Sequence, residues 1–285
     1  MIELLGNPLV TKLIDLSFEE DIGDGDHTSI ACINENETGR SIIVAKEEGI
    51  IAGIDLAEYV FNKVDPAIQI KKFFSDGDKI SNENIILEVQ GSSRNILTSE
   101  RTVLNFMQRL SGVATQTKKY VDELVGTKAK IIDTRKTTPG MRLLEKWAVR
   151  IGGGSNHRIG LFDMILIKDN HIDFAGGIER ALEKTHQYLK EKNINLRIEI
   201  ETRNVDEVRQ VIKIGGVHRI MLDNFSPEMI KEALLIINGK YETEASGGIT
   251  LSTLRKYAET GVNYISSGAL THSVKSIDLS LRAIK

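Results

Sequence analysis

Basic side chains are grouped in three short parts of the chain: Arg135 with Lys136, His157 with Arg158, and Lys168. Arginine offers planar, paired hydrogen bonds to a carboxylate or phosphate group, and lysine offers a mobile point charge. The whole chain has a formal net charge of -3 at pH 7, so this positive charge is local. The pattern predicts a binding site for a small polyanion.

Two acidic residues, Glu201 and Asp223, end neighbouring segments that have the pattern of β-strands. Neither has the histidine or cysteine neighbours that are typical of a zinc site. Oxygen ligands at a phosphate site suit Mg²⁺, which takes one or two carboxylates together with substrate oxygens and water. The carboxylates could also balance the nearby cations, and the two roles can coexist. We therefore expect Glu201 and Asp223 to form a Mg²⁺ site.

Two glycine-containing turns follow later strand-like segments. Ser246, Gly247 and Gly248 precede one helical segment, and Ser267 with Gly268 precedes the last helical stretch. Glycine lets the backbone approach a ligand closely, and a helix N-terminus adds N–H groups and a favourable dipole. Late turns of this kind in a barrel are typical of phosphate sites.

Strand-like and helix-like segments alternate through most of the chain after residue 110. The expected strands are 129–133, 164–168, 196–201, 219–223, 241–246 and 264–267. The expected helices are 141–150, 178–192, 205–214, 227–237 and 251–260. This alternation indicates a parallel sheet, and six or seven such units favour a closed or nearly closed α/β barrel. Because the carboxyl ends of barrel strands meet at one face, the residues described above would line one mouth.

A doubly wound open sheet is the alternative architecture. No Gly-x-Gly-x-x-Gly motif follows the first expected strand of this region, which disfavours a dinucleotide-binding domain. Strands can also end in polar residues simply because they reach solvent. Such ends rarely gather several cations, two carboxylates and two glycine turns, so we favour a functional site.

The beginning of the chain, residues 1–110, has the pattern of a separate α+β unit. Its short β-branched segments are 41–45, 49–52 and 84–89, and residues 55–64 have a helical pattern. A second helical pattern at 99–109 leads to 111–115, which we interpret as the passage into the barrel. We expect domain boundaries of 1–110, 111–270 for the barrel, and 271–285 for a C-terminal tail.

Composition excludes several classes of protein. The 285 residues exceed one average domain, and 41% hydrophobic and 27% charged residues are near globular averages. The slightly negative net charge argues against a general nucleic-acid or anionic-membrane binder. The single cysteine, Cys32, cannot form an internal disulfide. There is neither a signal-sequence pattern nor an apolar run of roughly 20 residues, so we expect a cytoplasmic protein.

These segments together resemble the quinolinate phosphoribosyltransferases, also called carboxylating nicotinate-nucleotide pyrophosphorylases. The most specific of them is the Thr-Arg-Lys-Thr-Thr-Pro-Gly run at residues 134–140. The other matching segments, in the family's order, are 21–26, 45–53, 97–106, 111–115, 152–158, 166–171, 222–224, 244–249 and 270–273. The resemblance covers nearly the whole chain.

The resemblance implies an α/β fold: an N-terminal α/β sandwich-like domain followed by an incomplete parallel α/β barrel of six or seven strands. The C-terminal tail would return to the first domain, and residues 156–161 would supply an extra barrel strand. The implied enzyme is a glycosyltransferase of NAD biosynthesis. It would transfer the phosphoribosyl group of phosphoribosyl pyrophosphate to quinolinate with decarboxylation, giving nicotinate mononucleotide, pyrophosphate and CO₂.

The resemblance also implies roles for the site residues. Lys136, Lys168, Glu201 and Asp223 would be catalytic, and the quinolinate-binding residues would be Arg101, Arg135, His157, Arg158 and Lys168, with Lys136 close by. Glu201 and Asp223 would bind the ribose hydroxyls and Mg²⁺, and the 5-phosphate would lie on Ser246, Gly247, Gly248 and Gly268, with Ser267 adjacent. The family often has a second valine where this chain has Thr202. This departure leaves open whether Glu199 or Glu201 is the working carboxylate, and we favour Glu201.

Arg101 precedes the barrel, and in the family it reaches the active site of the neighbouring subunit, which implies a homodimer or a multiple of dimers. Three alternative functions stay open. A nicotinate phosphoribosyltransferase would need fewer cations, and a relative associated with molybdenum transport shares parts of the barrel motifs. A non-catalytic phosphate-binding barrel would not need the carboxylates.

Overall fold

The computed structural model describes residues 2–284 of the chain. The chain forms two compact units. The first comprises Met1–Lys118, Thr137–Gly153 and Leu270–Lys285, and the second comprises Lys119–Lys136 and Gly154–Ala269. Residues 137–153, which we expected within the barrel domain, therefore group with the first unit. The expected boundaries near residues 110 and 270 stay predictions.

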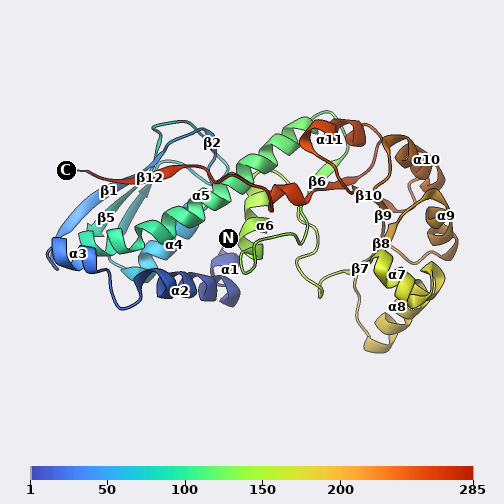
Figure 1. Ribbon diagram of the computed structural model, residues 1–285, viewed down its shortest axis with the longest axis horizontal. Helices are drawn as coiled ribbons and strands as arrows, with labels where there is room; N and C mark the ends of the chain where they lie inside the picture. The colour runs from blue at the N-terminus through green and yellow to red at the C-terminus, as the bar shows by residue number, and fades with distance from the viewer. Residues whose placement is uncertain (1, 285) are drawn as a thin grey trace. The chain divides into compact units, whose positions relative to one another are not determined.

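An antiparallel sheet with the strand order β12-β1-β5-β3 is the centre of the first unit (Figure 1). The strands of this unit are β1 (Thr38–Ala45), β2 (Gly49–Ile50), β3 (Gln69–Lys72), β4 (Lys79–Ile80), β5 (Ile85–Ser92) and β12 (Leu279–Ile284). Its helices are α1 (Ile2–Leu5), α2 (Pro8–Ile22), α3 (His27–Cys32), α4 (Ile54–Val64), α6 (Arg142–Ile151) and the first part of α5 (Ser93–Glu123). The C-terminal segment supplies an edge strand, because β12 pairs with β1 from Arg40↔Ile284 to Ala45↔Leu279.

Helix α5 continues without interruption through residues 111–115, so the expected passage between domains lies inside one helix of 31 residues. Gly112, within this segment, has a packing role. A Cβ atom at Gly112 would lie 2.4 Å from the main-chain oxygen of Lys275 and 3.0 Å from the side chain of Val274. Glycine is therefore needed because the C-terminal segment packs directly on the helix.

Replacing Gly112 by valine should lower the melting temperature of the protein. The new side chain would collide with a main-chain oxygen, and overpacking of this kind typically costs about 1–3 kcal/mol. Thermal unfolding followed by circular dichroism measures the effect. The matched control is Asn105→Val, at an exposed position of the same helix, where we expect a change within about 0.5 kcal/mol. Equal melting temperatures for both variants would contradict the close approach.

Arg109 of α5 connects three segments of the first unit. Its guanidinium donates to Oε1 of the fully buried Glu145 on α6 at 3.0 and 2.7 Å. It also donates to Oγ1 of Thr138 and to the main-chain oxygen of Val274, both at 3.4 Å. These bonds anchor the residues that follow the Thr-Arg-Lys segment and the residues that follow the last barrel strand.

Six parallel strands in the order β6-β11-β10-β9-β8-β7 form the second unit, and its helices lie along the outer side of the strands (Figure 1). The strands are β6 (Lys130–Ile132), β7 (Ile165–Ile167), β8 (Ile198–Thr202), β9 (Arg219–Asp223), β10 (Glu242–Ser246) and β11 (Tyr264–Ser266). The helices are α7 (Asp169–Ala175), α8 (Ile178–Lys192), α9 (Val205–Ile214), α10 (Pro227–Ile237) and α11 (Leu251–Ala258), and the 3₁₀ helix η1 (Gly268–Leu270) follows β11. This is the expected incomplete α/β barrel.

Residues 156–161 do not form the extra barrel strand that we expected. Only Ser155 pairs with the sheet, through a single parallel bridge to Ile132. Beyond it, the carboxylate of Asp163 accepts the main-chain N–H groups of Ile159 and Gly160 at 2.7 and 2.8 Å. These bonds turn the chain away from an extended strand. Within residues 2–284, no helix has both the length and the apolar composition needed to cross a membrane.

Candidate active site

The structure brings together the side chains that follow three barrel strands. Lys168 directly follows β7, Glu201 lies near the end of β8, and Asp223 ends β9. Lys168 is close enough to act electrostatically on both carboxylates, and Lys136, after β6, acts on Asp223. The barrel places these residues at one mouth because all its parallel strands point the same way.

The two predicted metal-binding carboxylates have perturbed acidity. Burial, followed by the charge of Asp223, raises the pKa of Glu201 to about 7. Burial also raises the pKa of Asp223, although a hydrogen bond from Asn224 opposes the shift. Two partly buried carboxylates that repel each other favour a cation between them. Their oxygen donors fit a Mg²⁺ ion that completes its coordination with substrate oxygens and water.

The structure separates the roles of the two glutamates on β8. Glu199 is fully buried, and its carboxylate lies by His157 and the Arg219 guanidinium. Glu201 is two residues nearer the carboxyl end of the strand and has Asp223 and Lys168 as its charged neighbours. These neighbours are consistent with the prediction that favours Glu201, which itself stays a prediction.

Arg158 and Arg135 are two neighbouring members of the predicted cation cluster. Arg158 is 9% exposed and donates a hydrogen bond to the main-chain oxygen of Met164 at 3.2 Å. Burial and then the charge of Arg135 lower the pKa of the Arg158 guanidinium. Arg135 itself is exposed. Two neighbouring cations, one of them buried, are stabilised by an anion that pairs with both.

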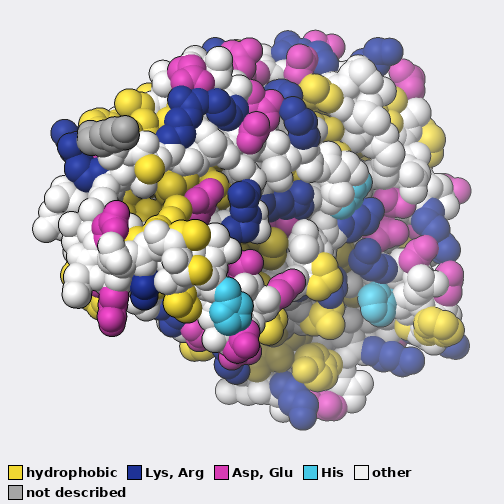
Figure 2. All heavy atoms as spheres, turned by 60° about the vertical axis from the view of Figure 1, so that its left-hand side comes forward, with side chains coloured by type: hydrophobic (Ala, Val, Ile, Leu, Met, Phe, Trp, Pro, Cys, Tyr) yellow, Lys and Arg dark blue, Asp and Glu magenta, His cyan; other side chains and the backbone are white. Residues whose placement is uncertain are grey.

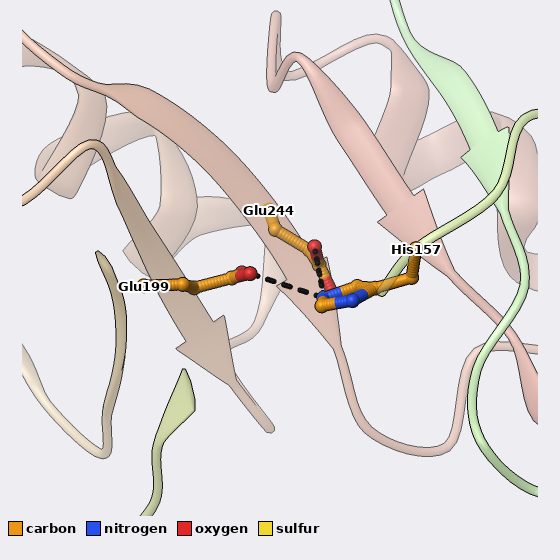
Figure 3. Close-up of side chains that lie close together, drawn as sticks. All are labelled: His157, Glu199 and Glu244. Carbon is orange, nitrogen blue, oxygen red and sulfur yellow. Dashed lines mark ion pairs between the residues drawn. The ribbon is translucent and has the colours of Figure 1, made fainter. Parts of the chain in front are cut away.

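The imidazole of His157 lies between two buried carboxylates, one from β8 and one from β10 (Figure 3). Its Nε2 is 3.0 Å from Oε2 of Glu199 and 3.4 Å from Oε2 of Glu244. Burial lowers the pKa of His157, but the two carboxylates outweigh it and raise the pKa to about 9. The main-chain N–H of Arg158 lies 2.7 Å from Nδ1, which opposes a second proton there. The carboxylates beside Nε2 and the N–H group beside Nδ1 therefore both favour a proton on Nε2.

His157, Glu199 and Glu244 also bring one possible metal ligand each within 4.8 Å of one another. Arg219 already supplies a cation at this position. Its Nη1 is 2.9 Å from Glu244 and 3.7 Å from Glu199. The cluster is therefore better described as a buried ion-pair network than as a metal site.

The predicted phosphate-binding turns follow β10 and β11. Gly247 and Gly248 have φ angles of 96° and 61°, which strongly favour glycine. A Cβ atom at Gly247 would lie 2.2 Å from the side chain of Asn224, so the turn packs against the end of β9. Gly248 is exposed, and apart from its chain neighbours no atom of residues 2–284 lies within 4 Å of its Cβ position. Ser267 is buried and donates its N–H to Ile132, and Gly268 begins η1.

Arg101 belongs to the first unit, on α5. Its side chain is 62% exposed, and its guanidinium is 3.9 Å from Glu100. The role that the family resemblance gives to Arg101 stays a prediction.

On the face drawn in Figure 2, Lys and Arg side chains are interspersed with Asp and Glu side chains, so that face is not a continuous basic surface.

The sequence analysis missed the buried network of Glu199, Arg219 and Glu244. Strands buried on both faces of a parallel sheet are usually apolar throughout. Here β8 and β10 alternate charged and uncharged residues, as in Glu199-Ile-Glu201 and Glu242-Thr-Glu244. This alternation was the available signal for a polar interior.

Sequence models of both domains of one family match the chain. The C-terminal domain of quinolinate phosphoribosyl transferase matches residues 113–282, and the N-terminal domain matches residues 26–111. The chain is 48% identical to quinolinate phosphoribosyltransferase [decarboxylating] 2, mitochondrial, of Nicotiana glauca, over 95% of this chain and 81% of the relative. It is 46% identical to the probable nicotinate-nucleotide pyrophosphorylase [carboxylating] of Bacillus subtilis, over 95% of this chain and 92% of the relative.

Among solved structures, the nicotinate-nucleotide pyrophosphorylase of Francisella tularensis superposes with a TM-score of 0.91. It is 44% identical, and the match covers 99% of both chains. The two domain matches follow in order along the chain, and the relatives span nearly its whole length. The protein therefore belongs to the quinolinate phosphoribosyltransferase family.

Proposed function

We propose that this protein transfers the phosphoribosyl group of phosphoribosyl pyrophosphate to quinolinate and releases nicotinate mononucleotide, pyrophosphate and CO₂. Membership of the family is the observation that carries the proposal. The arrangement of the barrel mouth supports it, because Lys168 and Lys136 lie near the carboxylates of Glu201 and Asp223. A pair of anionic substrates and a divalent cation would satisfy both sets of charges.

Each group of residues has a distinct task in this reaction. Arg135, Arg158 and Lys168 bind the two carboxylates of quinolinate and turn its ring nitrogen toward the anomeric carbon of the ribose. The turn at Gly247–Gly248 binds the 5-phosphate through main-chain N–H groups. Holding two reactants in attacking geometry removes much of the entropic barrier to their reaction.

Glu201 and Asp223 would hold Mg²⁺ together with the ribose hydroxyls. When bound, the ion supplies positive charge that stabilises the departing pyrophosphate. The ring nitrogen then attacks the anomeric carbon as the bond to pyrophosphate breaks. Loss of CO₂ next to the quaternised nitrogen leaves a carbanion that the adjacent ring charge stabilises. No side chain needs to form a covalent bond.

A direct assay tests the proposed function. The purified protein is incubated with quinolinate, phosphoribosyl pyrophosphate and Mg²⁺, and nicotinate mononucleotide and CO₂ are quantified. Equal amounts of the two products are expected. Formation of the nucleotide without CO₂, or of neither product, would contradict the proposal. A cytoplasmic location stays a prediction of the sequence analysis.

We also propose a homodimer, or a multiple of dimers, in which Arg101 completes the site of the neighbouring subunit. Arg101→Ala and Arg135→Ala should each be nearly inactive alone, because each leaves quinolinate without one of its cations. A mixed dimer places both changes in one of its two sites and leaves the other site intact. Co-expression with two affinity tags isolates the mixed dimers, whose activity should approach half that of wild type.

The control is a mixture of two differently tagged Arg135→Ala chains, in which no intact site can form. If verified Arg101→Ala/Arg135→Ala mixed dimers are as inactive as this control, the subunits do not share their sites.

A further inference from the structure

The segment that carries His157 and Arg158 is held by side chains of the barrel interior and has almost no strand pairing. Asp133, directly after β6, is fully buried. Its Oδ1 accepts the main-chain N–H of His157 at 2.8 Å, and its Oδ2 accepts the side-chain amide of Asn156 at 2.6 Å. Among residues 2–284, the one strand pairing found for this segment is the bridge from Ser155 to Ile132.

The imidazole of His157 provides the second attachment. Glu199 and Glu244 reach its Nε2 from β8 and β10 (Figure 3). Arg219 of β9 lies by both carboxylates, so the attachment spans three adjacent strands. The next residue, Arg158, directs its main-chain N–H at Nδ1 of the same ring. The position of the Arg158 backbone is thereby coupled to the orientation of the imidazole.

We propose that Glu199 and Glu244 are positioning residues that act through His157 to hold Arg158 in place for quinolinate. The inference rests on the proposed function of the protein. It adds Glu244 to the site, and it gives Glu199 a role different from the metal and ribose role that the sequence analysis left open for it. Their effect on the substrate is indirect, because they contact His157 and Arg219.

The carboxylate of Glu199 is the nearer of the two to the imidazole, with Oε2 3.0 Å from Nε2 against 3.4 Å for Glu244. Both carboxylate oxygens of Glu199 are buried, and Oε2 also lies 3.7 Å from Nη1 of Arg219. A buried carboxylate in this position is stabilised by ion pairs, here with His157 and Arg219. Glutamine has nearly the same shape but no charge. Glu199→Gln should therefore release the imidazole while it preserves the packing of the strand.

Glu242 of β10, two residues before Glu244, offers a matched control. Its Oε2 is 3.3 Å from Arg219, in the same network, and no contact with His157 is found among residues 2–284. The side chain is 35% exposed and also pairs with Arg197. Glu242→Gln therefore removes the same charge from the same arginine without touching the imidazole.

The test measures quinolinate affinity by titration calorimetry and the KM values for both substrates. Glu199→Gln should weaken quinolinate binding by at least about tenfold, the order expected when a charged hydrogen-bonding partner is lost. In Glu199→Gln the KM for phosphoribosyl pyrophosphate should change by less than about twofold. In Glu242→Gln the quinolinate affinity and the KM for phosphoribosyl pyrophosphate should each change by less than about twofold, because a part-exposed ion pair contributes little. Glu199→Asp keeps the charge and should recover part of the affinity.

Histidine ¹⁵N NMR of the wild-type protein gives a second readout that needs no variant to fold, with the His157 signal assigned by selective labelling. A slowly exchanging, hydrogen-bonded proton on Nε2 is expected. Absence of that proton would overturn the proposal. Equal losses of quinolinate affinity in Glu199→Gln and Glu242→Gln would also overturn it, as would an unchanged affinity in both variants. A wild-type protein that turns over no quinolinate would instead contradict the proposed function, and the NMR signal would still show whether the network exists.

Discussion

Nicotinate should be used about 10⁴-fold less efficiently than quinolinate, as judged by kcat/KM for the two acids. A site built to pair with a charged group rejects an analogue that lacks the group by up to about 10⁴–10⁵-fold. Arg158 is buried beside Arg135, and burial and the neighbouring charge both lower its pKa. The two adjacent carboxylates of quinolinate can pair with both cations, whereas the single carboxylate of nicotinate leaves one unpaired.

The same argument predicts the effect of removing one cation. Arg158→Ala should lower kcat/KM for quinolinate by at least about 10²-fold, because a substrate carboxylate is left without its partner. The control is Arg209→Ala on α9, whose side chain is 57% exposed and lies 4.0 Å from Glu232. That variant should retain wild-type activity. A wild-type enzyme that uses both acids equally well would replace the quinolinate assignment with a nicotinate phosphoribosyltransferase.

Loss of either Glu201 or Asp223 should lower activity by about 10²–10³-fold, the range seen when one electrostatic contact to the reacting group is removed. The two carboxylates are close enough for Asp223 to raise the pKa of Glu201. Either alanine variant would leave the proposed divalent cation with a single protein ligand. The effect should appear in the KM for phosphoribosyl pyrophosphate, while quinolinate affinity measured by calorimetry stays near the wild-type value.

Asp173→Asn is the control for this experiment. Asp173 is an exposed acidic residue of α7 that pairs with Arg203 at 3.2 Å. We expect its activity and its dependence on Mg²⁺ to match wild type. Undiminished turnover by Glu201→Ala and Asp223→Ala in excess chelator would remove the metal from the mechanism.

Local sequence patterns predicted most of the second unit. The expected helices 178–192, 205–214 and 227–237 and the strand 219–223 have the same bounds in the structure. Their ends carry strong local signals, such as Asn204 and Ser226, whose side chains cap the following helices. Capping and hydrophobic periodicity depend only on neighbours along the chain, so they can be recognised without the fold.

Predictions that depended on distant contacts were less successful. The helical pattern at 99–109 gave no reason to extend α5 through Gly112, because glycine is unfavourable inside a helix. Its presence there is explained by another segment that packs closely against the helix. That segment, 274–276, is far away in the sequence. Residues 156–161 were wrongly expected to form a strand, since their main-chain partners are side chains of Asp133 and Asp163.

The sequence by itself determined the family and predicted the reaction and the set of polar residues at the strand ends, because these residues stand in short motifs whose spacing is visible. Only the tertiary structure decided the different surroundings of the two glutamates of β8. Glu199 and Glu201 lie on the same face of the strand, two residues apart. Their charged neighbours, Glu244 with Arg219 and Asp223 with Lys168, come from other strands. Barrel closure sets these neighbours, and it therefore places one glutamate in the barrel interior and the other nearer the mouth.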